Sequence, residues 1–149
     1  REQLRERALL LDGDMLWVGG DFQTIQVTGQ TGHVNSLVAW NRATDTWFGT
    51  DGGVTRSTGS SDVWGRVYAL ARLNGELYVG GMFDKVGGAV AATGVARFDG
   101  TSWNALGSGV GGDVLREVTA LAVDRTDLYV GGRFAAAEAC AASVLLSRA

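Results

Sequence analysis

The sequence predicts an all-β fold built from internal repeats, and three observations lead to this prediction. A heptapeptide of the form Leu-aromatic-Val-Gly-Gly-x-Phe occurs three times, beginning at Leu16, Leu77 and Leu128. The first two copies lie 61 residues apart and the last two 51 residues apart, and spacings of about this length are typical of repeat architectures. The composition agrees, because 23 glycines, five tryptophans and no proline favour short aromatic strands joined by glycine turns.

The second repeat shows the plan most clearly, with strands expected over residues 67–73, 76–81, 94–98 and 101–106. Asn74-Gly75 separates the first two strands, and Asp99-Gly100 separates the last two. Both dipeptides tolerate the positive φ angles of tight hairpins. Four short strands joined in this way, and repeated along the chain, describe the blades of a β-propeller.

The other repeats follow the same plan with one deficit. Strands are expected over 8–11, 15–20, 37–40 and 46–48 in the first repeat, and over 118–123, 128–132 and 144–148 in the third. The sequence thus predicts three four-stranded antiparallel repeats, the last without its fourth strand, over about 4–63, 64–114 and 115–149. Closed propellers have roughly four to eight blades, so three would form an incomplete ring. Either the chain is a segment of a longer propeller, which we favour, or several chains complete one ring.

Three connections are expected to be loops. Residues 49–62 are polar and account for most of the longer spacing between the first two repeats. Residues 84–93 are glycine-rich, and His33 falls in a Gly/Thr-rich connection between strands. The alanine-rich residues 135–142 have high helix propensity, but their alignment with 84–93 favours a loop over a helix.

Composition excludes several classes of function. A net charge of −3 argues against a nucleic-acid partner, and no apolar run is long enough for a membrane span. Cys140 and His33 are the only residues of their kinds, so neither a disulfide nor a multi-histidine metal site can form within the chain. The only histidine adjoins no nucleophile motif, so we expect no enzymatic activity, no cofactor and no metal.

A few side chains are candidates for ligand binding. Trp64 borders the polar residues 49–62 and is the best candidate for an exposed contact residue, whereas Trp40, Trp47 and Trp103 fit a core better. Asp21, Asp84 and Glu138 occupy near-equivalent loop positions in the three repeats. The glycine pairs are expected to be structural, since they suit close approach of backbones, although they could also line a binding mouth; they are Gly19, Gly20, Gly80, Gly81, Gly131 and Gly132.

The motifs resemble those of a known family. The segments 77–88 and 95–110 are similar to the kelch-like β-propeller repeats of bacterial secreted and cell-surface proteins and of fungal cortical polarity marker proteins. The resemblance extends from about residue 8 to residue 148. It departs where Glu138 and Ala139 replace Gly87 and Gly88, and at the end of the third repeat. It implies a propeller used for binding or display and carries over no catalytic residue.

The function expected from these observations is a non-catalytic propeller segment that serves as a protein-interaction or structural module. Its partner would be other blades, of the same chain or of another chain. An extracytoplasmic location, secreted or at the cell surface, agrees with the resemblance. The alternative is a carbohydrate-binding or glycan-processing propeller, which would need exposed tryptophan and paired carboxylates at one mouth.

Overall fold

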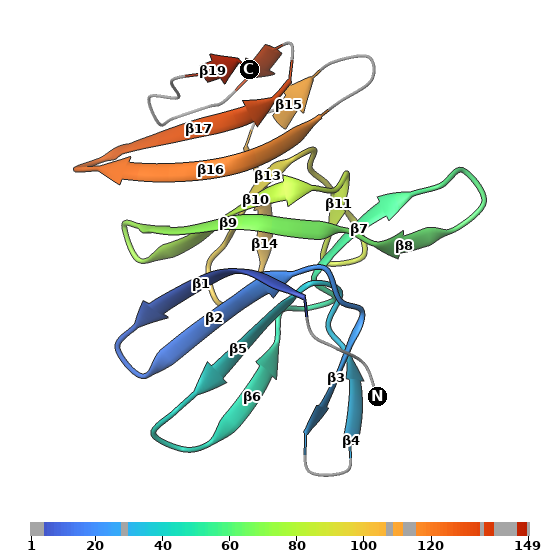
Figure 1. Ribbon diagram of the computed structural model, residues 1–149, viewed down its shortest axis with the longest axis vertical. Helices are drawn as coiled ribbons and strands as arrows, with labels where there is room; N and C mark the ends of the chain where they lie inside the picture. Colours follow the sequence, from blue (N-terminus) through green and yellow to red (C-terminus); the bar gives the residue numbers. More distant parts are fainter. Residues whose placement is uncertain are drawn as a thin grey trace.

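The chain folds as an all-β protein in the computed structural model (Figure 1). The structure describes residues 5–27, 30–106, 109–111, 116–134, 136–138 and 146–148. Sheet 1 contains four antiparallel strands in the order β1 (Glu6–Asp12), β2 (Met15–Gly20), β5 (Leu37–Asn41) and β6 (Thr46–Gly49). The four strands expected for the first repeat are therefore confirmed.

Sheet 2 repeats this arrangement with the strands expected for the second repeat. Its order is β9 (Arg66–Leu73), β10 (Glu76–Met82), β13 (Val95–Phe98) and β14 (Trp103–Ala105), all antiparallel. The turn between β9 and β10 has φ of 52° at Asn74 and 79° at Gly75. This is the positive-φ pair that an Asn-Gly hairpin supplies.

Sheet 3 differs from the prediction in one strand. The strands β16 (Glu117–Asp124) and β17 (Asp127–Arg133) form the expected hairpin. The third strand, β19 (Leu146–Arg148), is present, but it pairs parallel to β17, so the antiparallel prediction was wrong for it. A leucine-rich segment specifies a strand but not its direction, which depends on the connection that leads into it.

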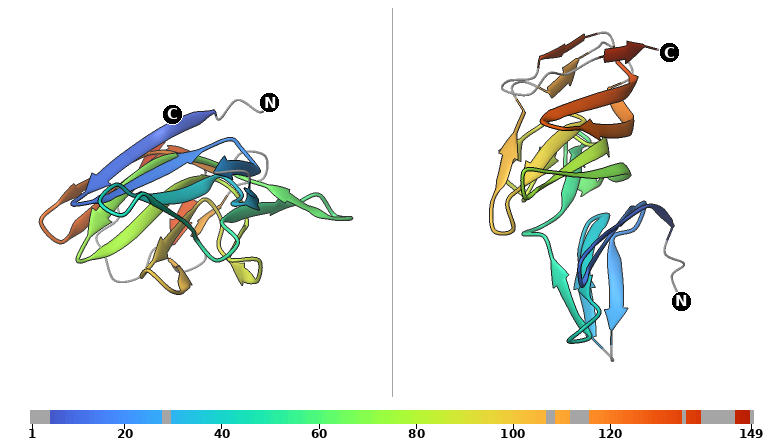
Figure 2. Two further views of the ribbon diagram at one scale, coloured as in Figure 1. Left: turned by 90° about the horizontal axis from the view of Figure 1, so that it is seen from below. Right: turned by 90° about the vertical axis from the view of Figure 1, so that its left-hand side faces the viewer.

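The three sheets pack face to face in chain order, with sheet 2 in the middle (Figures 1 and 2). One apolar cluster fills the space between sheets 1 and 2 and includes Trp17, Leu77 and Phe98. A second cluster lies between sheets 2 and 3 and includes Tyr78, Val118 and Leu128. Both faces of sheet 2 are therefore covered, and the described sheets form an open stack with no closed ring.

The connections contain strands where loops were expected. Residues 49–62 contribute β7 (Val54–Ser57) and part of β8 (Asp62–Trp64), while residues 84–93 contain β11 (Lys85–Val86) and β12 (Val90–Ala91). Together these strands form a small antiparallel sheet, called here the strand-end sheet, in the order β12-β11-β7-β8. The polar composition suggested a loop, but the β-branched residues of β7 have long-range partners that only the folded chain brings near.

Two further loop predictions were also wrong. His33 ends the hairpin of β3 (Thr24–Val27) and β4 (Gln30–His33). Within residues 135–142, β18 (Ala136–Glu138) pairs with β15 (Gly109–Gly111). The competing helix is absent from the described residues of this segment, because β18 pairs with a strand supplied by the preceding connection.

The two glycines of each heptapeptide have separate structural tasks. A side chain at Gly19 would overlap Val67 of sheet 2, and one at Gly80 would overlap Val118 of sheet 3. The first glycine thus admits the first strand of the next sheet. A side chain at Gly20, Gly81 or Gly132 would instead collide with the backbone of the first strand in its own sheet, beside the β-bulge that each hairpin contains.

Candidate functional site

Trp64 and Asp21 lie together at the end of sheet 1, although 43 residues separate them in the chain. The indole N–H of Trp64 donates a hydrogen bond of 3.0 Å to Oδ1 of Asp21. The other oxygen of Asp21 lies 3.2 Å from Nε of Arg66, the first residue of β9. Trp64 is 38% exposed, so one ring is both held by its edge and open to solvent.

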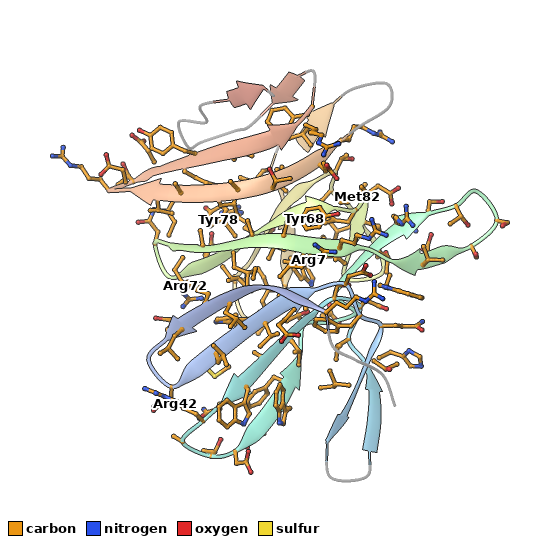
Figure 3. All side chains as sticks on the ribbon, in the orientation of Figure 1. Arg7, Arg42, Tyr68, Arg72, Tyr78 and Met82 are labelled. Carbon is orange, nitrogen blue, oxygen red and sulfur yellow. The ribbon has the colours of Figure 1, made fainter. Side chains whose placement is uncertain are left out.

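A small network of cations and rings continues from this pair along the first strands of sheets 1 and 2. The pKa of the Arg66 guanidinium is raised above its ordinary value, first by a hydrogen bond with Tyr68 and then by the charge of Asp21. The guanidinium carbon of Arg7 lies 5.5 Å from the centre of the Tyr68 ring, as a cation–π contact requires (Figure 3). These contacts hold Arg66 and Arg7 in place as fixed positive charges.

Asp84 lies beside the strand-end sheet and is occupied by backbone contacts. Its two carboxylate oxygens accept the backbone N–H of Ser57, at 3.0 and 3.1 Å. The neighbouring Lys85 pairs with Asp62 at 2.6 Å, and this contact raises the pKa of the Lys85 ammonium group. The carboxylate of Asp84 therefore fastens the β7–β8 hairpin to the end of sheet 2.

A hollow of about 200 Å³ opens next to Asp84. It is lined by Arg56, Ser57, Met82, Phe83, Asp84, Thr93 and Arg116. The two arginines come from the connections that follow sheets 1 and 2, and neither has a carboxylate within 4 Å among the described residues. Two arginines against one carboxylate make the hollow positive, although the whole chain has a net charge of −3.

The chemistry of this hollow suits the binding of an anion. Guanidinium groups present planar arrays of donors that match carboxylates and phosphates. Glycoside hydrolysis by paired acids would need two carboxylates close to the same bond of one substrate. Asp21 is taken by Arg66 and Trp64, and Asp84 by Ser57, so the two expected acids point to different partners.

The remaining predicted residues lie elsewhere. Only the backbone of Glu138 is described, opposite Gly109 in the β15–β18 ladder. His33 is exposed at the end of β4. Within the part of the chain that the structure describes, no three His, Cys, Asp or Glu side chains gather as metal ligands would. No helix there is long and apolar enough to cross a bilayer.

The tryptophans expected in a core divide into two groups. Trp103 is buried and donates its indole N–H to the carbonyl oxygen of Thr50 at 2.6 Å. Trp40 and Trp47 stack on each other on the outer face of sheet 1, with ring centres 5.9 Å apart, and both are only half-buried.

Sequence reasoning missed Arg56 and Arg116, the two residues that give the hollow its charge. Neither arginine belongs to a repeated motif, and the two lie 60 residues apart in the sequence. A useful signal would have been their shared location, since each follows the last strand of one repeat and precedes the first strand of the next.

Comparison with known proteins adds no assignment. No protein-family model matches the chain, and no curated protein matches its sequence.

Proposed function

We propose that the chain is a segment of a β-propeller and serves as a non-catalytic protein-interaction module, secreted or displayed at the cell surface. The observation that supports this best is the face-to-face stack of three sheets, each built from one repeat, in which sheets 1 and 2 have the same antiparallel strand order (Figure 1). A radial stack of four-stranded sheets is the construction principle of a propeller.

The contact surface of this module would be the positive hollow. Arg56 and Arg116 have no acidic partner among the described residues. Trp64 is exposed but pairs with Thr55, so its side chain lies on the opposite face of the strand-end sheet from Arg56. Arginine is among the residue types enriched at the centres of protein interfaces. An acidic segment of a partner protein would satisfy the charge of this surface.

A fluorescently labelled acidic decapeptide, titrated in an anisotropy assay, tests this proposal. We expect binding that weakens as salt is added, because exposed charges are screened. The double variant Arg56→Glu/Arg116→Glu should weaken binding by at least about tenfold, equivalent to about 1.4 kcal/mol. The matched control is Arg42→Glu, an exposed arginine that pairs with Asp14 at the far end of sheet 1. Equal binding by the double variant and the control would contradict the proposal.

The glycan-processing alternative has less support. It requires carboxylates that are free to act on one substrate, whereas Asp21 and Asp84 each hold a structural partner. A screen of oligosaccharides with the same protein would separate the two functions, because a glycan site would respond to Trp64→Ala and not to the arginine variants.

A further inference from the structure

We propose that the outer face of sheet 1 is a docking surface for a second copy of this chain, which presents the outer face of its sheet 3. This inference rests on the propeller architecture proposed above. It concerns a surface separate from the positive hollow, so the two proposals can fail independently.

The outer face of sheet 1 is apolar. Its part along β1 is exposed, whereas Val18 and Val38 are buried in a cluster with Phe22 and Val34. Leu9 is 62% exposed and Leu11 is 56% exposed, while Leu10 between them points inward and packs against the cluster shared with sheet 2. In the strand register Leu11 stands beside Leu16, Trp40 and Trp47 in turn. Side chains at such paired positions share one face, so two exposed leucines and a tryptophan pair form a continuous patch.

The repeat shows what covers this face elsewhere in the molecule. Leu77 and Val79 of the second repeat lie 61 residues after Leu16 and Val18 and correspond to them in position. Trp40 pairs with Leu16 as Phe98 pairs with Leu77, and Trp47 pairs with Trp40 as Trp103 pairs with Phe98. On sheet 2 these positions lie under sheet 1, where Leu77 and Val79 are 0% exposed. The exposed leucines of β1 and the half-buried Trp40 and Trp47 therefore belong to the same half of a sheet–sheet interface, whereas Val18 is already buried within sheet 1's own repeat.

Sheet 3 carries the complementary half on its outer face. Its outer face presents Ala120, Ala122 and Tyr129, and the two alanines are exposed. A shift of 51 residues relates them to Ala69, Ala71 and Tyr78 of sheet 2, which are at most 9% exposed beneath sheet 3. One chain thus displays both halves of an interface that it already forms twice internally.

Applying the internal packing to two copies predicts particular contacts. Trp17 contacts Phe98 edge to face with ring centres 6.3 Å apart. Tyr129 is the counterpart of Trp17 in sheet 3, and Trp40 is the counterpart of Phe98 in sheet 1. Tyr129 of one copy should therefore contact Trp40 of the other. Asp12 pairs with Arg72 across sheets 1 and 2 at 2.9 Å. The counterpart of Asp12 in sheet 3 is Asp124, and the counterpart of Arg72 in sheet 1 is Leu11. Asp124 of one copy should therefore face Leu11 of the other. By the same correspondence, the Asp21–Arg66 pair predicts that Arg133 of one copy lies near Arg5 of the other. Glu117, 3.3 Å from Arg133, reduces the repulsion between these two arginines.

A second copy is the occupant we propose because it brings the matching surface with the matching spacing. Head-to-tail contacts of this kind close into a ring when the rotation allows. Two copies would contribute six sheets, within the roughly four to eight of closed propellers.

Native mass spectrometry of the chain, with circular dichroism of the same sample, is the first test. We expect a β-rich assembly of twice 15.6 kDa. A folded monomer, an aggregate without defined mass, or a complex with an unrelated protein would each overturn the proposal.

Two substitutions at neighbouring leucines sharpen this test. Leu9→Arg places a charge within the apolar patch and should raise the dissociation constant of the assembly at least about tenfold. Leu11→Arg adds the same charge two residues away, but it would meet Asp124 as Arg72 meets Asp12, and should leave the dissociation constant unchanged or lower. Equal effects of the two variants would overturn the proposed register.

A cross-linking experiment keeps the proposal testable if Leu9→Arg fails to fold. A photoreactive phenylalanine analogue at position 9, in a mixture of isotopically light and heavy chains, should form light–heavy cross-links to residues 117–133. The same analogue at Phe48, an exposed residue outside the docking patch, serves as control. Cross-links only within one chain, or only to other segments, would overturn the proposal.

Discussion

The hydroxyl of Ser36 donates a hydrogen bond of 2.6 Å to the carbonyl oxygen of Gly65, and this bond joins the end of sheet 1 to the residue before sheet 2. Ser36 is completely buried, has a φ of 69°, and accepts a hydrogen bond from the backbone N–H of Phe22 at 3.2 Å. The side chain of Ser36 therefore links its own segment to those of Phe22 and Gly65, which are distant in the sequence.

Replacement of Ser36 by alanine should destabilise the fold by about 1–3 kcal/mol, because the carbonyl group of Gly65 would lose this bond while buried surroundings keep water away. Urea unfolding followed by circular dichroism measures this free energy. Thr46→Ala is the control, since its hydroxyl makes an exposed bond to the Thr44 carbonyl. Similar losses in both variants would contradict the role assigned to Ser36.

Replacement of Gly80 by alanine should cost about 1–3 kcal/mol, the usual range for overpacking, since the new methyl group overlaps Val118 of sheet 3. Gly81→Ala should cost more, because its methyl group meets the carbonyl of Arg66, which the sheet holds in place. Gly49→Ala is the control, with nothing within 4 Å of the added methyl group. Chemical denaturation ranks the three variants, and a neutral Gly81→Ala would refute this explanation of the glycine pair.

Replacement of Asp21 by asparagine should have two effects of different size. The ion pair with Arg66 is partly exposed, so stability should fall by only about 0.2–1 kcal/mol, and less at high salt. Affinity for the acidic peptide should rise, because Arg66 becomes available beside the hollow. Thermal melts at two salt concentrations and the anisotropy assay measure these effects; unchanged peptide affinity would place Arg66 outside the contact surface.

The turn at Asp99 should make stability depend on pH in the acidic range. Backbone N–H groups of Ser102 and Thr101, and then the Thr101 hydroxyl, donate to this carboxylate and lower its pKa below the ordinary 3.8. A lowered pKa in the folded state means that the contribution to stability is present above about pH 4 and is lost as pH falls through the folded-state pKa.

The titration of the Asp99 carboxyl carbon, followed by nuclear magnetic resonance, tests this directly. The midpoint should lie below 3.8. The stability difference between the native chain and Asp99→Asn should be largest near neutral pH and should shrink in acid. A midpoint above 3.8 would show that the turn hydrogen bonds do not form in solution.

The sequence by itself determined the strands of sheets 1 and 2 and the first hairpin of sheet 3. This was possible because the deciding signals are local: Asn74-Gly75 sets a turn through its own φ angles, and alternating apolar residues mark the strands beside it. The repeated heptapeptide then related one sheet to the next. Trp64 and Asp21 were identified as candidates, but nothing local indicated that they bind each other.

Only the tertiary structure decided the site and the small sheets. The strand Val54–Ser57 pairs on one side with the nearby Asp62–Trp64 and on the other with Lys85–Val86, far along the chain. The direction of Leu146–Arg148 depends on the connection that leads to it. The hollow depends on Arg56 and Arg116 meeting at one sheet end. Such proximity follows from how the sheets stack, a long-range packing property that composition and periodicity do not encode.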